Sequence, residues 1–280
     1  NNTGNELTLA QVLENAGERI DEKFANRPDL ASEVRHTIGY SMLSHHRLDA
    51  AAKMLETAHR ESIDAYGAED IRTLRILDGL AELRREQGRT DEAVALYLQG
   101  IEAIERIGLR NDPLYPSLLN NLGLLYLIEE DYARADPYLQ RALAAMDAGT
   151  APGHPADHAM LVANLAQVAH GLEDLPRADR LYRQAQAELE LAFPEGTPDI
   201  AFLLNNRALL AEEQGQLEES LALHRESLAV RRRSFRNEHP MVAVALLGTV
   251  LTALTAVSVR VIDAADEQAA EIRLEAEAAI

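Results

Sequence analysis

The chain has 280 residues, with 27 lysines and arginines against 46 aspartates and glutamates, and its net charge of −19 excludes a broad basic surface for nucleic acid or anionic lipid. It contains no cysteine, which excludes disulfide frameworks, thiolate metal sites and a cysteine nucleophile and leaves the compartment open. Hydrophobic residues make up 47% of the chain and aromatic residues only 4%, so alanine and leucine form most of the core, and this composition predicts an all-α protein.

The first predicted element is one amphipathic helix within residues 1–27. Its apolar residues recur with a helical period, and Thr8 and Gln11 have the spacing of a capping box. The apolar stripe consists of Leu7, Leu9, Val12, Leu13, Ala16, Ile20 and Phe24. We expect this helix to cap the elements that follow. No basic segment followed by an apolar run opens the sequence, so it indicates no signal peptide.

A repeat of about 42 residues follows. Prolines that can open helices recur at intervals of 42, 43 and 42 residues, namely Pro113, Pro155, Pro198 and Pro240. A related phrase follows each proline: LLNNLGLLY at 118–126, LVANLAQVA at 161–169, LLNNRALLA at 203–211 and ALLGTVLTA at 245–253. Counting back by the same period reaches ILDGLAELR at 76–84 and RHTIGYSML at 35–43. Residues 28–280 are therefore predicted to form six repeats, at about 28–67, 68–110, 111–153, 154–196, 197–238 and 239–280.

Each repeat is predicted to form a hairpin of two helices. In the first helix, apolar and small residues recur every three or four positions, which places them on one face. The second helix carries a small residue early, where a larger side chain would hold the paired helices apart. These residues are Ala93, Ala135, Ala178 and, in the fifth repeat, Ser220. Because one such hairpin cannot bury its own apolar face, we expect the hairpins to stack into an α-solenoid.

The phrase Leu-x-x-Leu-Gly-x-x-Tyr, present as Leu119, Leu122, Gly123 and Tyr126, resembles the tetratricopeptide repeat. The 42-residue period, the asparagine pair and the His-Pro at the unit boundary resemble the longer subtype of kinesin light chains and many bacterial signalling proteins. The opening of the chain is also similar to the repeat region attached to bacterial serine/threonine kinases, although no kinase motif is present. The resemblance implies a right-handed α-solenoid that acts as a non-catalytic protein- or peptide-binding scaffold, recognising a partner in its concave groove.

In the family, polar side chains of the first helices line that groove and bind the backbone of a peptide. The residues at the matching positions are Asn120, Asn121, Asn164, Gln167, Asn205 and Asn206. The alternative is that these amides bond to neighbouring helices inside the solenoid. The other groove positions are Arg75, Asp78, Glu82, Arg85 and Glu86 in the second repeat, Leu124, Leu127 and Ile128 in the third, and Phe202, Leu209, Glu212 and Glu213 in the fifth. Such a surface suits a peptide with apolar anchors and some positive charge, although the paired glutamates also fit a solvated face.

One arginine and two pairs of histidines need separate interpretation. Arg207 stands where other repeats place a core leucine, so it either reaches an acidic partner or loosens the packing. His154 and His158 have the spacing of helical metal ligands, but a helix that begins at Pro155 leaves His154 outside its turns. We therefore predict no metal site, and no cofactor or catalytic motif is recognised. The pair His45 and His46 is expected to be exposed at a hairpin turn.

The last repeat contains 19 uncharged residues, Met241 to Val259, which is long enough for the lower range of a membrane span. The repeat phase of Pro240 and a stripe of hydroxyl residues argue against insertion. A terminal repeat should have a polar outer face, so this apolar one is expected to be covered, either in a homodimer or by residues outside the chain. The candidate contacts are Val244, Leu247, Leu251 and Leu254. A structural or oligomerisation module is thus the alternative function. The cytoplasm is favoured as compartment, and an extracytoplasmic position is compatible with a membrane-anchored kinase.

Overall fold

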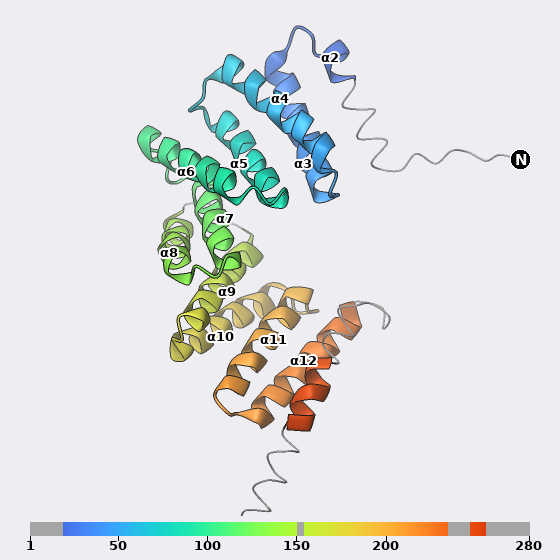
Figure 1. Cartoon of the computed structure of the whole chain (residues 1–280), viewed down its shortest axis with the longest axis vertical. Helices are drawn as coiled ribbons and strands as arrows, with labels where there is room; N and C mark the ends of the chain where they lie inside the picture. Colours follow the sequence, from blue (N-terminus) through green and yellow to red (C-terminus); the bar gives the residue numbers. More distant parts are fainter. Residues whose placement is uncertain (1–18, 150–153, 235–246, 256–280) are drawn as a thin grey trace, which may run out of the picture. The chain divides into compact units, whose positions relative to one another are not determined.

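A computed structural model describes residues 19–149, 154–234 and 247–255, which fall into two compact units divided between Ala151 and Pro152. All regular elements among the described residues are helices, as the composition predicts (Figure 1). In the first unit they are α2 (Ile20–Lys23), α3 (Pro28–Ser44), α4 (Leu48–Tyr66), α5 (Ile71–Glu86), α6 (Thr90–Ile107), α7 (Leu114–Ile128) and α8 (Tyr132–Ala148). In the second they are α9 (Pro155–Gly171), α10 (Leu175–Ala192), α11 (Pro198–Glu213) and α12 (Leu217–Ser234), followed by helical residues 247–255.

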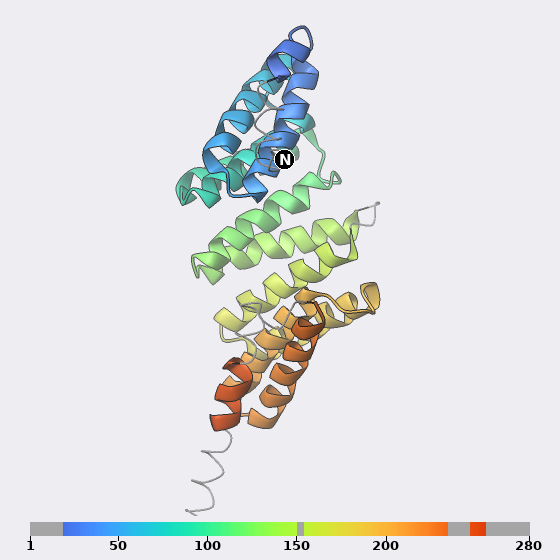
Figure 2. The same ribbon diagram turned by 90° about the vertical axis from the view of Figure 1, so that its right-hand side faces the viewer.

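Consecutive helices pack in pairs, α3 with α4, α5 with α6 and α7 with α8 in the first unit (Figure 2). The pairs stack because the second helix of one contacts the first helix of the next, and α5 also contacts both α3 and α7. In the second unit, α9 pairs with α10 and α11 with α12, and α9 contacts α11. Each unit is therefore a stack of helical hairpins whose first helices lie side by side, as predicted for a solenoid.

The predicted capping helix is described only from residue 19 onward. Ile20–Lys23 is helical and Ile20 is buried, and the chain turns before α3 begins at Pro28. The carboxylate of Asp21 accepts a hydrogen bond from the buried guanidinium of Arg35 in α3. This end of the segment therefore packs on the first hairpin, and residues 1–18 of the prediction lie outside the described residues. The sixth repeat stays a prediction for the same reason, since only residues 247–255 of it are described.

The small residues early in the second helices lie inside the hairpins. Ala93, Ala135, Ala178 and Ser220 are fully buried. Opposite Leu139 of α8, α7 presents Gly123, where even a methyl group would lie 2.6 Å from Leu139 Cγ. The side chains between the paired helices are chiefly leucine and alanine, which is how so few aromatic residues suffice for a continuous core.

The five hairpin turns in the described part of the chain all end the first helix in the same way. One residue adopts a left-handed conformation, with φ of 54° at His46, 71° at Gly88, 57° at Glu130, 61° at Glu173 and 74° at Gly215. The next residue donates its N–H to the carbonyl five positions earlier, as Asp131 does to Tyr126 at 2.8 Å. This is the Schellman arrangement, which satisfies helix-end carbonyls and prefers glycine at the left-handed position. The turns recur at the interval of the sequence repeat even where glycine is missing.

Replacing Glu130 by glycine is expected to raise the free energy of unfolding by about 1 kcal/mol. The left-handed conformation costs a side-chain-bearing residue roughly 1–2 kcal/mol, and the extra freedom of glycine in the unfolded chain offsets only part of that gain. Gly88→Ala, at the equivalent turn, should lower stability by a similar amount. Urea unfolding followed by circular dichroism measures both; shifts of the two midpoints in the same direction would contradict the explanation.

Candidate functional site

The first helices of unit 1 form a face that carries both apolar and hydrogen-bonding side chains. We call it the first-helix face and define it by Tyr40 of α3, Asp78 of α5 and Asn121, Leu124 and Ile128 of α7. Tyr40 and Ile128 are 48% and 55% exposed, whereas Asp78, Asn121 and Leu124 are partly buried. Tyr40 was not predicted from the sequence, because the first repeat has no asparagine that would identify this face of its first helix. The face therefore offers contact area to a partner as well as polar groups.

Asp78 and Asn121 connect two neighbouring first helices. The Asn121 amide Nδ2 donates a hydrogen bond to Asp78 Oδ1 at 3.1 Å. Burial raises the pKa of the Asp78 carboxyl to about 6; the bond from Asn121 lowers it and the nearby charge of Glu82 raises it further. One amide proton of Asn121 is therefore used inside the solenoid, as the alternative interpretation of the asparagines requires, while its carbonyl remains an acceptor.

The other charged residues of α5 have ionic partners. Glu82 Oε2 accepts hydrogen bonds from Arg85 Nε at 3.0 Å and from the hydroxyl of Tyr97 in α6 at 3.2 Å. Glu86 lies beside Arg85 and 3.7 Å from the exposed imidazole of His46. Arg75 is exposed and its Nη2 lies 3.5 Å from the carboxylate of Asp112. Burial raises the pKa of Tyr97, and the neighbouring carboxylates add to this effect.

In unit 2 the first helices α9 and α11 are joined by a side-chain contact that the sequence did not suggest. His170 Nε2 lies 2.8 Å from Glu213 Oε2. Leu209 of α11 is 43% exposed and Phe202 is half-buried, so both side chains are accessible on this helix. Glu213 itself is exposed, in keeping with a solvated position.

The asparagines of unit 2 are less open than those of an exposed ladder. Asn164 is only 8% exposed and has an interaction partner, while Gln167, Asn205 and Asn206 are partly buried. The Asn206 Nδ2 atom is buried and has no hydrogen bond of normal geometry among the described residues, although the amide lies beside the Tyr182 hydroxyl and influences its pKa. The buried tyrosines Tyr97 and Tyr182, whose hydroxyls reach polar groups of the first helices, were not predicted from the sequence. Each follows the small alanine of its second helix by four residues, and this spacing is a signal that could have predicted them.

Comparison with known proteins identifies this architecture. Models described as tetratricopeptide repeat match residues 30–106, 116–145 and 203–240, and together they cover just over half of the chain. The chain belongs to the tetratricopeptide-repeat family. The comparison with curated proteins finds no matching sequence.

Solved tetratricopeptide-repeat and related structures resemble the chain. BtubC (BKLC) from P. vanneervenii is 25% identical over 63% of this chain and 70% of its own, with a TM-score of 0.56. The nearly identical repeats of a protein described as a kinesin light chain from Podosopora anserina are 18% identical, cover 75% of this chain and 99% of theirs, and have a TM-score of 0.62. A Signal Transduction ATPase with Numerous Domains from Pyrococcus horikoshii, which has a tetratricopeptide repeat sensor, is 15% identical, with a TM-score of 0.68 over 88% of this chain but only 36% of that protein. The last two similarities show the fold alone.

Leu127, which was assigned to the face, and Arg207, which stands at a core position, both belong to the tetratricopeptide-repeat packing. Leu127 is buried. Arg207 is 9% exposed, and its Nη1 donates a hydrogen bond to Gln186 Oε1 of α10 at 2.6 Å. Its Nη2 lies 3.7 Å from Glu219 of α12. Of the two explanations for Arg207, the structure therefore supports contact with a polar and acidic environment, and that environment lies within the repeats.

The histidines of the tetratricopeptide repeats serve separate local contacts. His154 caps α9 by accepting the N–H of Ala156 at 3.3 Å, and its ring stacks on Phe193. His158 Nδ1 lies 2.7 Å from Glu188 of α10. The prediction that α9 begins at Pro155 is confirmed. Over the described ranges, no group of three or more histidine, aspartate and glutamate side chains is placed to hold a metal ion. His45 and His46 are exposed at the α3–α4 turn, as expected.

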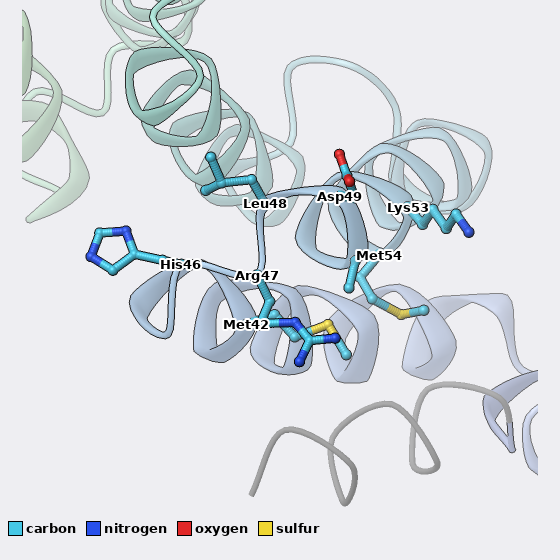
Figure 3. A pocket seen from close by; sticks show the side chains of 8 residues that line it. Met42, His46, Arg47, Leu48, Asp49, Lys53 and Met54 are labelled. Atoms are coloured by element: carbon cyan, nitrogen blue, oxygen red, sulfur yellow. The ribbon is translucent and has the colours of Figure 1, made fainter.

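A hollow of about 520 Å³ lies away from the first-helix face, at the turn between α3 and α4 (Figure 3). It is lined by Met42, His46, Arg47, Leu48, Asp49, Ala50, Lys53 and Met54. Figure 3 shows the imidazole of His46 and the ammonium end of Lys53 pointing away from each other. The polar groups of this hollow therefore do not converge on a common point, as those of a ligand site do.

The helical residues 247–255 pack on unit 2 by one side only. Thr252 is buried and donates a hydrogen bond to Glu212, which also accepts one from Ser220 at 3.1 Å. Glu212 is thus part of the packing rather than of a solvated face. Leu247, Leu251 and Leu254 are exposed, whereas Val244 lies outside the described residues. No helix within the described parts is long and apolar enough to span a membrane; most of Met241–Val259 is outside them.

Proposed function

We propose that the chain is a non-catalytic recognition module that binds a segment of a partner protein along the faces of its first helices. Tetratricopeptide repeats generally mediate interactions between proteins, and stacked repeats use the surface lined by their first helices for this purpose. The observation that carries the proposal is the exposure of Tyr40, Ile128 and Leu209 on first helices, among amide and carboxylate groups. An extended segment needs both kinds of contact, because apolar side chains supply affinity and amides orient its backbone.

A signalling setting is part of the proposal. It is supported by the resemblance of the opening segment to repeat regions of bacterial kinases and by the structural likeness to a signal-transduction ATPase with a tetratricopeptide repeat sensor. In that setting, binding of the partner to the repeats would regulate an effector domain, either in the same protein or in a second protein.

The test places a photo-crosslinking amino acid, p-benzoylphenylalanine, at Tyr40 or Ile128 of unit 1 in cells of the source organism. Light-dependent crosslinks to the same partner are expected from both positions. Leu191 of α10 is a matched control, because it is apolar and 84% exposed but lies on a second helix. Exposed positions are preferred to Asn121 and Asn164, whose replacement would disturb contacts between or within the hairpins.

The double variant Tyr40→Ala, Ile128→Ala should weaken binding of the crosslinked partner by at least about tenfold, since large apolar anchors contribute most at interfaces. The double variant must retain the helicity of the parent chain. Equal crosslinking from Leu191 and Tyr40, or unchanged affinity of the double variant, would refute recognition by the first helices.

Self-association is a second candidate, favoured by the exposed Leu247, Leu251 and Leu254. It predicts that crosslinks from position 251 join two copies of this chain. A monodisperse monomer in light scattering at micromolar concentration would exclude it.

A further inference from the structure

Asp78 is the one charged residue of α5 whose side chain has no ionic partner among the described residues. Glu82 and Glu86 share Arg85, and Arg75 lies beside Asp112. Asp78 accepts a single hydrogen bond, from the neutral amide of Asn121. Its position between two helices makes this incomplete solvation costly, because a partly buried carboxylate normally has a cation or several donors.

The surroundings of Asp78 suit the stem of a long side chain. Burial raises the pKa of the Tyr40 phenol, and the nearby charges of Asp78 and Glu82 raise it further, so Asp78 lies close to this ring, which is half exposed. On α7, Asn121 is partly buried, and Leu124 and Ile128 follow it by about one and two helical turns. Both first helices that contact α5 therefore carry exposed apolar side chains. Such a combination fits an amphipathic cation, whose methylene groups pack on apolar surface while the charged end meets the carboxylate.

Building on the proposed function, we infer that the first-helix face of unit 1 selects a partner segment in which a lysine or arginine, paired with Asp78, is flanked by an apolar residue that packs on Tyr40 or Ile128. The opposite charges give a hydrogen bond stronger than one between neutral groups. The net charge of −19 acts in the same direction, because it attracts cationic segments before contact. An acidic segment would instead place like charges together at Asp78.

A displayed library of random twelve-residue peptides, selected on the whole chain, tests this specificity without knowledge of the natural partner. Selection is expected to enrich lysine or arginine within three residues of a leucine, isoleucine or aromatic residue. The same selection on Asp78→Asn should lose the basic residue and keep the apolar one. Glu102→Gln is the matched control, because it removes one negative charge from an exposed position of α6 in the same unit. Its selection should match that of the parent chain.

A double-mutant cycle on one synthetic peptide from the library then measures the pair itself. Asp78→Asn should weaken binding of the lysine peptide by about 10- to 100-fold, the usual range for a hydrogen bond between charged groups. Replacing the lysine by norleucine keeps the stem, and this peptide should bind the parent chain equally weakly. The two changes together should cost little more than either alone.

Three outcomes count against the inference. Enrichment of acidic or only apolar residues, or basic residues that persist on Asp78→Asn, would overturn the pairing and leave the proposed function standing. Additive losses in the cycle would show that the lysine does not meet Asp78. If no peptide binds the parent chain and Tyr40 gives no crosslinks, both the inference and the proposed function are overturned.

Discussion

Replacing Asp78 by asparagine is expected to raise the free energy of unfolding at pH 7 by about 2 kcal/mol. Asparagine has the shape of aspartate and can still accept the hydrogen bond from Asn121, but it carries no charge to desolvate. The structural cause is the position of the carboxylate between first helices, with one neutral donor and no cation among the described residues. Urea unfolding of both proteins, followed by circular dichroism, measures the difference.

The pH dependence of that difference gives a sharper test. The carboxyl has a pKa near 4 in the unfolded chain and about 6 in the folded one. The folded state binds this proton more tightly, so the ionised group destabilises the fold fully at pH 7 and progressively less as the pH falls from 6 towards 4. The advantage of Asp78→Asn should therefore shrink over this interval and be small at pH 4.

Asp70→Asn at the start of the same helix is the matched control, because the pKa of Asp70 is shifted in the direction opposite to that of Asp78. Asp70 caps α5, and its hydrogen bonds with Arg72 lower the pKa of its carboxyl. Its replacement should give no gain at pH 7. A lower or unchanged unfolding midpoint for Asp78→Asn would show that the carboxylate is adequately solvated and would remove one argument for an external cation. A gain in stability combined with weaker peptide binding would mark Asp78 as a residue kept for function at a cost in stability.

Gly123→Ala is expected to lower the free energy of unfolding by about 2 kcal/mol, although alanine favours helices over glycine by about 1 kcal/mol. The added methyl group would lie 2.6 Å from both Cγ and Cδ2 of Leu139, which is fully buried in α8. Because the Cγ atom is close to the helix backbone, the clash requires α7 and α8 to move apart. The measurement is again the midpoint of urea unfolding.

Gly79→Ala supplies the control for this prediction. Its methyl group would lie 3.5 Å from His36 and from Leu55, which is ordinary contact, so helix propensity should dominate and stability should rise by up to about 1 kcal/mol. In a cycle with Leu139→Ala, the cost of Gly123→Ala should largely disappear, since the clashing atoms are gone. A loss that persists without the leucine side chain would point to a cause other than the helix crossing.

The helices and their pairing could be predicted from the sequence because they depend on local signals. Pro155 and Pro198 begin α9 and α11, and Pro113 precedes α7 by one residue. Ala93, Ala135 and Ala178 are buried at the crossings where small residues were expected. Leu124, Ile128 and Phe202 were placed on the face by the groove positions of the tetratricopeptide-repeat resemblance, which also placed the buried Leu127 there. The left-handed turn at Glu130 and Glu173 was less visible, because the hydrogen bonds of the helix end impose it without glycine.

The partner of each polar side chain could not be predicted in this way. Asn121 was a candidate for binding a peptide, but its amide donates to Asp78, which lies 43 residues earlier in the chain. The two explanations for Arg207 were equally open until Gln186 and Glu219 were seen beside it. By itself, the sequence determined the helical hairpins and the face of each helix that carries apolar residues, since both depend on the period along one helix. Only the tertiary structure decided which polar groups have internal hydrogen-bond partners and which, like the Asp78 carboxylate, have no charged partner among the described residues. The reason is that these contacts depend on the distances between helices that stacking brings together.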